Sequence, residues 1–186
     1  MRIFVCSLLL IAALLGVVVD GTAESGLRIV VWKARRELWV FRGGDVVRRY
    51  SVSLGREPKG PKRLRGDGRT PEGRYLVVDK KADSKFHRFL ALNYPSAADA
   101  EQALRDGLIT ADVWADVWIA EVRHRHPPTD TILGTRVGIH GIGATGVRER
   151  LRRVSDWTEG CVALSDRDIE ELFEMAPIGT PVEIFE

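Results

Sequence analysis

One of only two cysteines in the chain lies in the segment Asp156-Trp157-Thr158-Glu159-Gly160-Cys161-Val162-Ala163-Leu164. Gly160 stands directly before Cys161 and has no side chain, so the backbone can approach a substrate closely there. The apolar residues from Val162 predict the start of a short buried strand. A free cysteine in such a place is either a small buried hydrophobe or a reactive thiol. Whether Cys161 is a buried hydrophobe or a reactive thiol depends on features elsewhere in the chain.

The length and composition are those of one soluble globular domain. The chain has 186 residues, of which 45% are apolar and 29% charged. This is enough to bury a core without disulfides or metals. The net charge of +2 is too small to argue for nucleic acid as a partner. There are two local basic patches, at Lys59 to Arg69 and at Arg148 to Arg153. Each is either a solvated face or a surface that attracts an anionic surface or substrate.

The N-terminus has the pattern of an export signal. Arg2 precedes an almost unbroken apolar run from Ile3 to Val19, and small residues lead to a plausible cleavage site after Ala23. We therefore predict a bacterial secretory signal peptide over residues 1–23 and export to the periplasm. A retained membrane anchor formed by residues 3–19 is the alternative, because the run approaches the length of a membrane span.

Export has a consequence for Cys161. Cleavage removes Cys6, so the mature chain carries one thiol and no partner for a structural disulfide. An odd cysteine in an exported protein is either buried or kept for its reactivity.

Residues 24–186 are predicted to form a single, mainly β domain with a few helices. Strands are indicated by runs rich in Val, Ile and aromatic residues at Leu27–Trp32, Glu37–Phe41, Arg74–Val78, Phe89–Leu92 and Val182–Phe185. Helices are predicted for Ala97–Asp106, for Ala111–Val122, which we expect to pack on the sheet, and after the N-cap Ser165. The segments Gly55–Arg69 and Gly141–Val154 are predicted to be loops.

A cysteine nucleophile needs a base, because a free thiol is mostly protonated at neutral pH. His140 is the best-placed histidine, since it ends an apolar strand and is followed by Gly141. His87 is the second candidate. His124 and His126 form an H-x-H pair, but the sequence offers no matching carboxylate or third histidine, so we expect no metal and no cofactor.

Three motifs follow one another in the second half of the chain: Gly138-Ile139-His140-Gly141, Thr158-Glu159-Gly160-Cys161-Val162 and Gly179-Thr180-Pro181-Val182-Glu183-Ile184. Together with Gly66 to Gly73 they resemble the L,D-transpeptidase catalytic (YkuD-type) domain, whose fold is β-sandwich or barrel-like. The likeness covers about residues 27 to 186. Three further segments resemble the compact subgroup of this family in Gram-negative periplasms: Asp156 to Thr158, Ser84 to His87 and Asn93 to Pro95.

The resemblance implies a cysteine acyl transfer on peptidoglycan stem peptides. Cys161 would attack the carbonyl between meso-diaminopimelate and the terminal D-Ala, and His140 would act as general base and then general acid. The backbone carbonyl of Gly141 would orient His140. Backbone N–H groups at Gly160 and Cys161 would form the oxyanion hole.

The resemblance also points to substrate contacts and partners. Trp157, Thr158, Ser84 and His87 are the residues that we expect to bind substrate. A second diaminopimelate as acceptor would give a crosslink, and a lysine of an outer-membrane lipoprotein would give protein anchoring. Carbapenem-type inhibitors are expected to acylate Cys161.

One position departs from the family pattern. Most members carry Arg or Asn two residues after the cysteine, where this chain has Ala163. The role of that Arg must be absent or supplied elsewhere, with Arg136, Arg148 and the arginines at 150 to 153 as candidates. The compact subgroup includes a member type that cuts lipoprotein from peptidoglycan, so hydrolysis is the alternative to crosslinking.

Other classes fit the sequence less well. A sortase-like enzyme needs an Arg on the strand that faces the thiol, and the only arginine after Cys161 is Arg167, at a helix start. Papain- and NlpC-type peptidases have their Cys before their His. An inactive cell-wall binding module is disfavoured by the retention of His140, Gly160 and Cys161.

Overall fold

The computed structural model describes residues 26–143 and 146–186, in which strands predominate over helices. The prediction of a mainly β domain is confirmed. The signal peptide or anchor predicted for residues 1–23 lies outside the described residues. The strands are β1 (Leu27–Trp32), β2 (Glu37–Arg42), β3 (Asp45–Ser51), β4 (Gly73–Ser84), β5 (His87–Leu92), β6 (Gly138–His140), β7 (Val162–Ala163) and β8 (Pro181–Phe185). The helices are α1 (Ala97–Arg105), α2 (Ala111–Val122), α3 (Gly146–Arg153) and α4 (Asp166–Met175).

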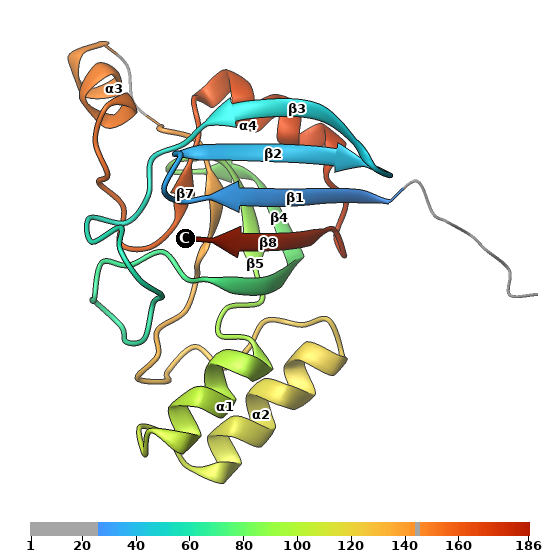
Figure 1. The fold of residues 1–186 in the computed structure, drawn as a ribbon, viewed down its shortest axis with the longest axis vertical. Helices are drawn as coiled ribbons and strands as arrows, with labels where there is room; N and C mark the ends of the chain where they lie inside the picture. The colour runs from blue at the N-terminus through green and yellow to red at the C-terminus, as the bar shows by residue number, and fades with distance from the viewer. Residues whose placement is uncertain (1–25, 144–145) are drawn as a thin grey trace, which may run out of the picture.

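The strands form one curled sheet in the order β3-β2-β1-β8-β4-β5-β6-β7 (Figure 1). The curl depends on β4, whose 12 residues are enough to pair with strands of both halves of the sheet. Gly73 to Leu76 pair with β8, and the part from Val77 onward pairs with β5. Irregular register in this second part bends the strand, as bulges do. The last strand in chain order, β8, lies parallel to the first, β1.

The core lies inside this curl and is closed by α4. Val31 and Val40 of the first strands are fully buried, as is Ile139 of β6. Ile169 and Leu172 from α4 join the same cluster. The predicted N-cap is confirmed, because the Ser165 side chain accepts a hydrogen bond from the Asp168 N–H.

Helix α2 does not pack on the sheet, and that expectation was wrong. Val117, its buried residue, packs with Ala100 and Ala103 of α1 and with Leu133. The two helices lie side by side beyond one end of the sheet (Figure 1). Helical periodicity identifies which face of a helix is apolar, but it does not identify the partner of that face.

The segment Gly141–Val154 was predicted to be a loop, yet it contains helix α3. The helix was missed because it lacks an apolar face toward the core: Val147 and Leu151, one turn apart, are both exposed. Hydrophobic periodicity detects helices that bury a stripe, and α3 buries little.

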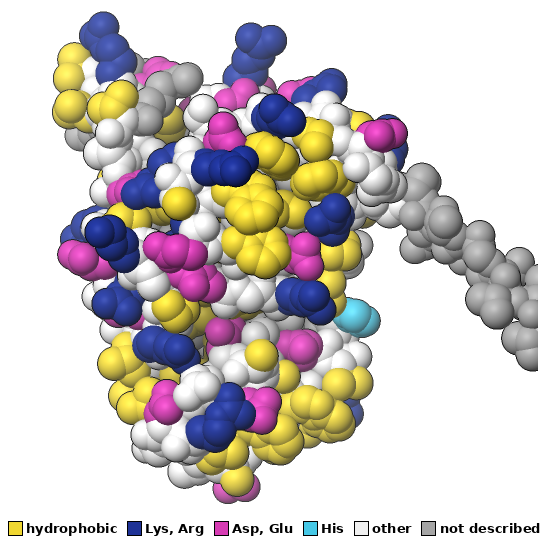
Figure 2. Space-filling view, in the orientation of Figure 1, with side chains coloured by type: hydrophobic (Ala, Val, Ile, Leu, Met, Phe, Trp, Pro, Cys, Tyr) yellow, Lys and Arg dark blue, Asp and Glu magenta, His cyan; other side chains and the backbone are white. Residues whose placement is uncertain are grey.

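An aromatic layer covers the outer face of β1, β2 and β8. Trp32, Trp39 and Phe41 alternate along these strands with core residues, and the Trp32 ring stacks on Phe185 with centroids 5.0 Å apart. Arginine guanidinium groups lie over the rings, the nearest being Arg28 over Phe41 at 4.2 Å. Figure 2 shows hydrophobic side chains in the middle of this face with basic side chains around them.

No helix of residues 26–143 and 146–186 is both long and apolar enough to cross a membrane.

Candidate active site

Strand pairing brings the segment of Cys161 beside the strand that carries His140. Strands β6 and β7 are parallel, and His140 is the register partner of Ala163. Cys161 stands two residues before Ala163, and side chains alternate along an extended chain. The thiol and the imidazole therefore emerge on the same side of the sheet from neighbouring strands.

The imidazole of His140 is held in one orientation and one tautomer. The side chain is 1% exposed, and its Nδ1 lies 2.6 Å from the backbone carbonyl oxygen of Gly141. A carbonyl oxygen only accepts, so Nδ1 carries the proton and donates it to this bond. In the neutral ring Nε2 is then the unprotonated nitrogen. Burial lowers the pKa of His140 to about 4, although the bond to Gly141 opposes this shift.

Aromatic rings surround the imidazole. Phe86 stacks on it with centroids 4.4 Å apart, and Phe89 lies parallel at 6.0 Å. The Trp157 ring meets it edge-on at 5.8 Å. The sequence analysis missed Phe86 and Phe89. Phe86 lies within the Ser84 to His87 segment that was singled out, but no pattern in the sequence distinguishes it from its neighbours.

The Cys161 thiol is half-buried and donates a hydrogen bond to the backbone carbonyl of Arg136, at 3.6 Å. Burial raises the pKa of Cys161 to about 11, and the nearby positive charges of Lys62 and Lys85 only reduce this effect. Since the pKa of His140 is lowered, both groups are neutral at pH 7. The proton would therefore leave the thiol during attack rather than before it.

The turn before the cysteine is fixed by Thr158. Its hydroxyl donates to the carbonyl of Cys161 at 2.7 Å and accepts from the N–H of Gly160 at 3.1 Å. Thr158 is buried, and its hydroxyl shapes the turn. A substrate contact by Thr158 stays a prediction. The N–H of Gly160, expected in the oxyanion hole, is engaged by the same hydroxyl.

Only glycine fits at position 160. Its φ is +135°, and a Cβ there would lie 2.5 Å from the carbonyl oxygen of Arg69. The loop Gly55–Arg69 thus presses its backbone against the cysteine turn. A backbone contact cannot move aside as a flexible side chain can, so the close approach depends on the missing side chain.

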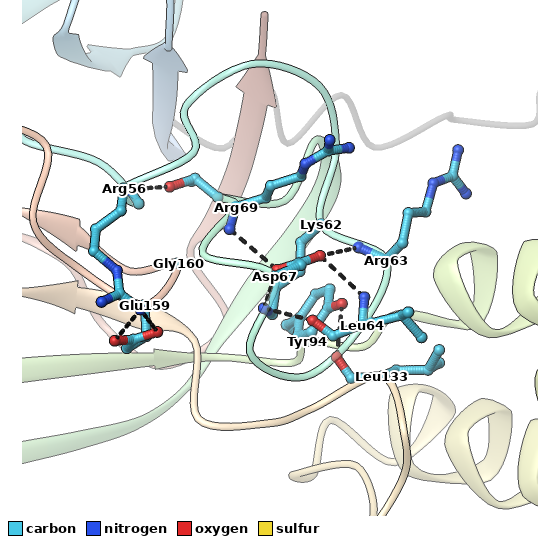
Figure 3. Close-up of polar contacts among 12 residues, drawn as sticks. Arg56, Lys62, Arg63, Leu64, Asp67, Arg69, Tyr94, Leu133, Glu159 and Gly160 are labelled. Carbon is cyan, nitrogen blue, oxygen red and sulfur yellow. Dashed lines mark hydrogen bonds and ion pairs between the residues drawn. The ribbon is translucent and has the colours of Figure 1, made fainter.

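A buried ion pair organises this loop (Figure 3). The Lys62 ammonium lies 2.7 Å from the Asp67 carboxylate, which also accepts from the backbone N–H groups of Arg63, Leu64 and Arg69. Lys62 is 5% exposed, so of the two readings of its basic patch the solvated face does not hold for this side chain. Its side chain reaches the space beside Gly160.

Ser84 and His87 support the turn that presents Phe86. The Ser84 hydroxyl accepts from the Phe86 N–H at 3.1 Å. His87 lies 2.7 Å from a carboxylate oxygen of Glu170 on α4. These contacts explain how Phe86 is placed. Direct substrate contacts by Ser84 and His87 stay a prediction.

Of the arginines considered at the site whose side chains the structure describes, Arg152 is the one in contact with an active-site ring. Its guanidinium lies 4.1 Å from the centroid of Trp157. Arg136 is exposed, and its backbone carbonyl receives the thiol hydrogen bond. The side chains of Arg148 and Arg153 are outside the described part of the chain.

The described residues hold no group of three or more His, Cys, Asp or Glu side chains that could bind a metal ion. His126 of the H-x-H pair lies instead 3.5 Å from Asp79.

Comparison with known proteins shows the family of the chain. The model of the L,D-transpeptidase catalytic domain family, YkuD, matches residues 26–184. The chain belongs to this family. No curated protein matches it.

Solved L,D-transpeptidases share the fold at low sequence identity. The helical cell shape determining protein Pgp2 from Campylobacter jejuni is 18% identical with a TM-score of 0.54, over 87% of this chain and 48% of that one. A mutant L,D-transpeptidase of Enterococcus faecium is 16% identical with a TM-score of 0.51, over 86% and 50% of the two chains. The chain thus spans about half the length of these relatives.

Proposed function

We propose that this protein is a peptidoglycan L,D-transpeptidase. The donor would be a tetrapeptide stem. Cys161 Sγ attacks the carbonyl carbon between meso-diaminopimelate and D-Ala while His140 Nε2 takes the thiol proton. The C–N bond then breaks, His140 returns the proton to the leaving nitrogen, and D-Ala departs from a thioester. An acceptor amine attacks the thioester and restores the thiol.

The observation that carries this proposal is the bond between His140 Nδ1 and the Gly141 carbonyl. It leaves Nε2 as the proton acceptor on the strand beside Cys161. A neutral thiol next to a neutral, oriented imidazole suits general-base attack on an amide.

We propose that the Cys161 N–H stabilises the oxyanion. The N–H of Gly160 bonds to Thr158, so Gly160 contributes by allowing the close backbone approach. A positioned backbone donor at the developing oxyanion accelerates acyl transfer by about 100-fold or more.

Hydrolysis is the second candidate, and Ala163 favours it. Ala163 is buried and is the register partner of His140, so no long side chain emerges at the place where most of the family carries Arg or Asn. If that side chain helps to hold an acceptor, water takes the acceptor's place here. Release of a lipoprotein from peptidoglycan is then the expected reaction.

The family consists of cell-wall enzymes, and we propose that this member acts in the periplasm after export. Its partners would be peptidoglycan stem peptides and an outer-membrane lipoprotein. The similar structure of Ldtfm is described as an avibactam carbamoyl enzyme. We expect carbapenem-type compounds to acylate Cys161 in the same sense.

The test is incubation of the purified protein with disaccharide-tetrapeptide and, separately, with lipoprotein-linked peptidoglycan, followed by mass spectrometry. Crosslinked dimers with released D-Ala mean transpeptidation, and released lipoprotein means hydrolysis. Cys161→Ala should abolish both reactions and the carbapenem adduct. Equal turnover by Cys161→Ala and wild type would refute the mechanism.

A further inference from the structure

Trp157 stands at the active site without a polar anchor. Its indole Nε1–H is buried and has no hydrogen-bond partner among the described residues. A buried tryptophan usually pairs this donor, and the pairing fixes the ring. Here the ring is held only by what packs on it. The ring centroids of Phe86 and His140 each lie 5.8 Å from that of Trp157, and a guanidinium lies over the Trp157 ring.

That guanidinium belongs to Arg152, a residue held by two side-chain contacts and one backbone contact. Its centre lies 4.1 Å from the Trp157 ring centroid, and its Nη1 donates to the Ile142 carbonyl at 2.7 Å. The Arg152 carbonyl accepts from the Ser53 hydroxyl at 2.7 Å. Ser53 in turn pairs through both backbone groups with Ala163, the register partner of His140. The end of α3 is thus tied to the catalytic strands.

We infer that Arg152 is a positioning residue for His140, which it holds in place through Trp157. This inference rests on the proposed function for its kinetic consequence only. Cation–π contact fixes the indole, and the rings of Trp157 and Phe86 confine the imidazole, whose Nε2 is the unprotonated nitrogen. Arg152 does not have to touch the substrate.

The charge of Arg152 adds an effect that can be measured. Three charged groups act on the imidazole: Arg152 from α3, Lys85 from the turn between β4 and β5, and Asp166 from α4. Arg152 and Lys85 lower the pKa of His140, and Asp166 raises it. Removal of Arg152 should therefore raise the pKa of His140. As the pH falls, the imidazole should then become protonated, and stop acting as a base, at a higher pH than in wild type.

The experiment compares Arg152→Ala, Arg152→Lys and Trp157→Ala with Arg150→Ala, an exposed arginine on the same helix. Arg152→Ala should lower kcat by about tenfold with KM nearly unchanged, as loss of one cation–π clamp predicts. Arg152→Lys should recover part of this loss. The double variant with Trp157→Ala should be no slower than the slower single variant, because both changes remove the same contact.

NMR titration of the His140 ring gives a readout that does not need turnover. Arg152→Ala should move the titration to higher pH, and Arg150→Ala should leave it in place. The inference would be overturned if the kcat losses of Arg152→Ala and Trp157→Ala added in the double variant. It would also be overturned if His140 titrated at the same pH in Arg152→Ala and Arg150→Ala. If wild type does not turn over the tetrapeptide, the proposed function fails and the titration still decides the role of Arg152. Should Arg152→Ala not fold, Arg152→Gln serves in both measurements.

Discussion

His140 Nδ1 lies 2.6 Å from the carbonyl oxygen of Gly141, and this contact determines which ring nitrogen can take a proton. The carbonyl does the orienting that a carboxylate does in a Ser-His-Asp triad. A carbonyl carries no full charge, so it does little to stabilise a protonated ring. The buried imidazole is accordingly neutral at rest, with its pKa lowered to about 4 by burial.

Thiol alkylation should report this neutral pair. Burial raises the pKa of Cys161 to about 11 from the ordinary 9.0. Two pKa units reduce the thiolate fraction by about 100-fold, so iodoacetamide should react at pH 7 about 100-fold more slowly than with an unfolded variant. The rate should still rise between pH 8 and pH 10. A rate that is already constant at pH 7 would indicate a thiolate–imidazolium pair and contradict this prediction.

Substitution of Gly160 should damage both stability and activity. In Gly160→Ala the new Cβ meets the Arg69 carbonyl at 2.5 Å, and alanine is strained at φ +135°. We expect a loss of about 2 kcal/mol or more in the free energy of unfolding, together with loss of turnover. Urea denaturation and the tetrapeptide assay measure the two effects.

Gly44→Ala is the matched control for this substitution. Gly44 has nothing within 4 Å of its Cβ position and no positive φ. Its unfolding free energy should change by less than about 0.5 kcal/mol. An equal loss in both variants would show that the Arg69 contact is unimportant.

Removal of the Phe86 ring should loosen His140. Phe86→Ala takes away the ring stacked 4.4 Å from the imidazole and admits water. Since burial is the main cause of the low pKa of His140, the pKa should rise toward 6.5. Misplacement of the base should lower kcat by about 10- to 100-fold. Phe41→Ala, on the outer face of the sheet, should change neither the NMR titration of His140 nor kcat.

Asp67→Asn should destabilise the loop that touches Gly160. It leaves the buried Lys62 ammonium without its carboxylate, at a cost of about 3 kcal/mol in unfolding free energy. Thermal denaturation measures this loss. Glu159→Gln breaks the exposed pair with Arg56 and should cost less than about 1 kcal/mol. Similar melting temperatures for the two variants would contradict the importance of the Lys62–Asp67 pair.

The same pair predicts a pH dependence. Burial would raise the pKa of Asp67, but hydrogen bonds from Leu64, Lys62 and the other donors outweigh it and lower the pKa below the ordinary 3.8. The contribution of Asp67 to stability is therefore present above pH 3.8 and is lost as the pH falls through the folded-state pKa. Wild type should lose more stability than Asp67→Asn when unfolding is compared at pH 6 and pH 3.

Much of the fold could be predicted because its signals are local. Runs rich in Val, Ile and aromatic residues predicted the strands from Leu27–Trp32 to Val182–Phe185, and caps such as Ser165 with Asp168 predicted helix starts. Partners were harder to predict than elements. Val117 lies on the apolar face that the sequence predicts for α2. Its contacts with Ala100 and Ala103 form only when α1 and α2 pack against each other.

The family of this protein and the candidate residues Cys161 and His140 could be predicted from the amino-acid sequence, since Gly138–Gly141 and Thr158–Val162 are local motifs in a fixed order. The surroundings of these two residues depend on the folded structure. Phe86, Arg152 and Lys62 come from three separate segments and carry no local mark of their role. Their effect depends on distance and burial, which arise only when segments far apart in the chain pack together. The raised pKa of Cys161 and the lowered pKa of His140 follow from that packing.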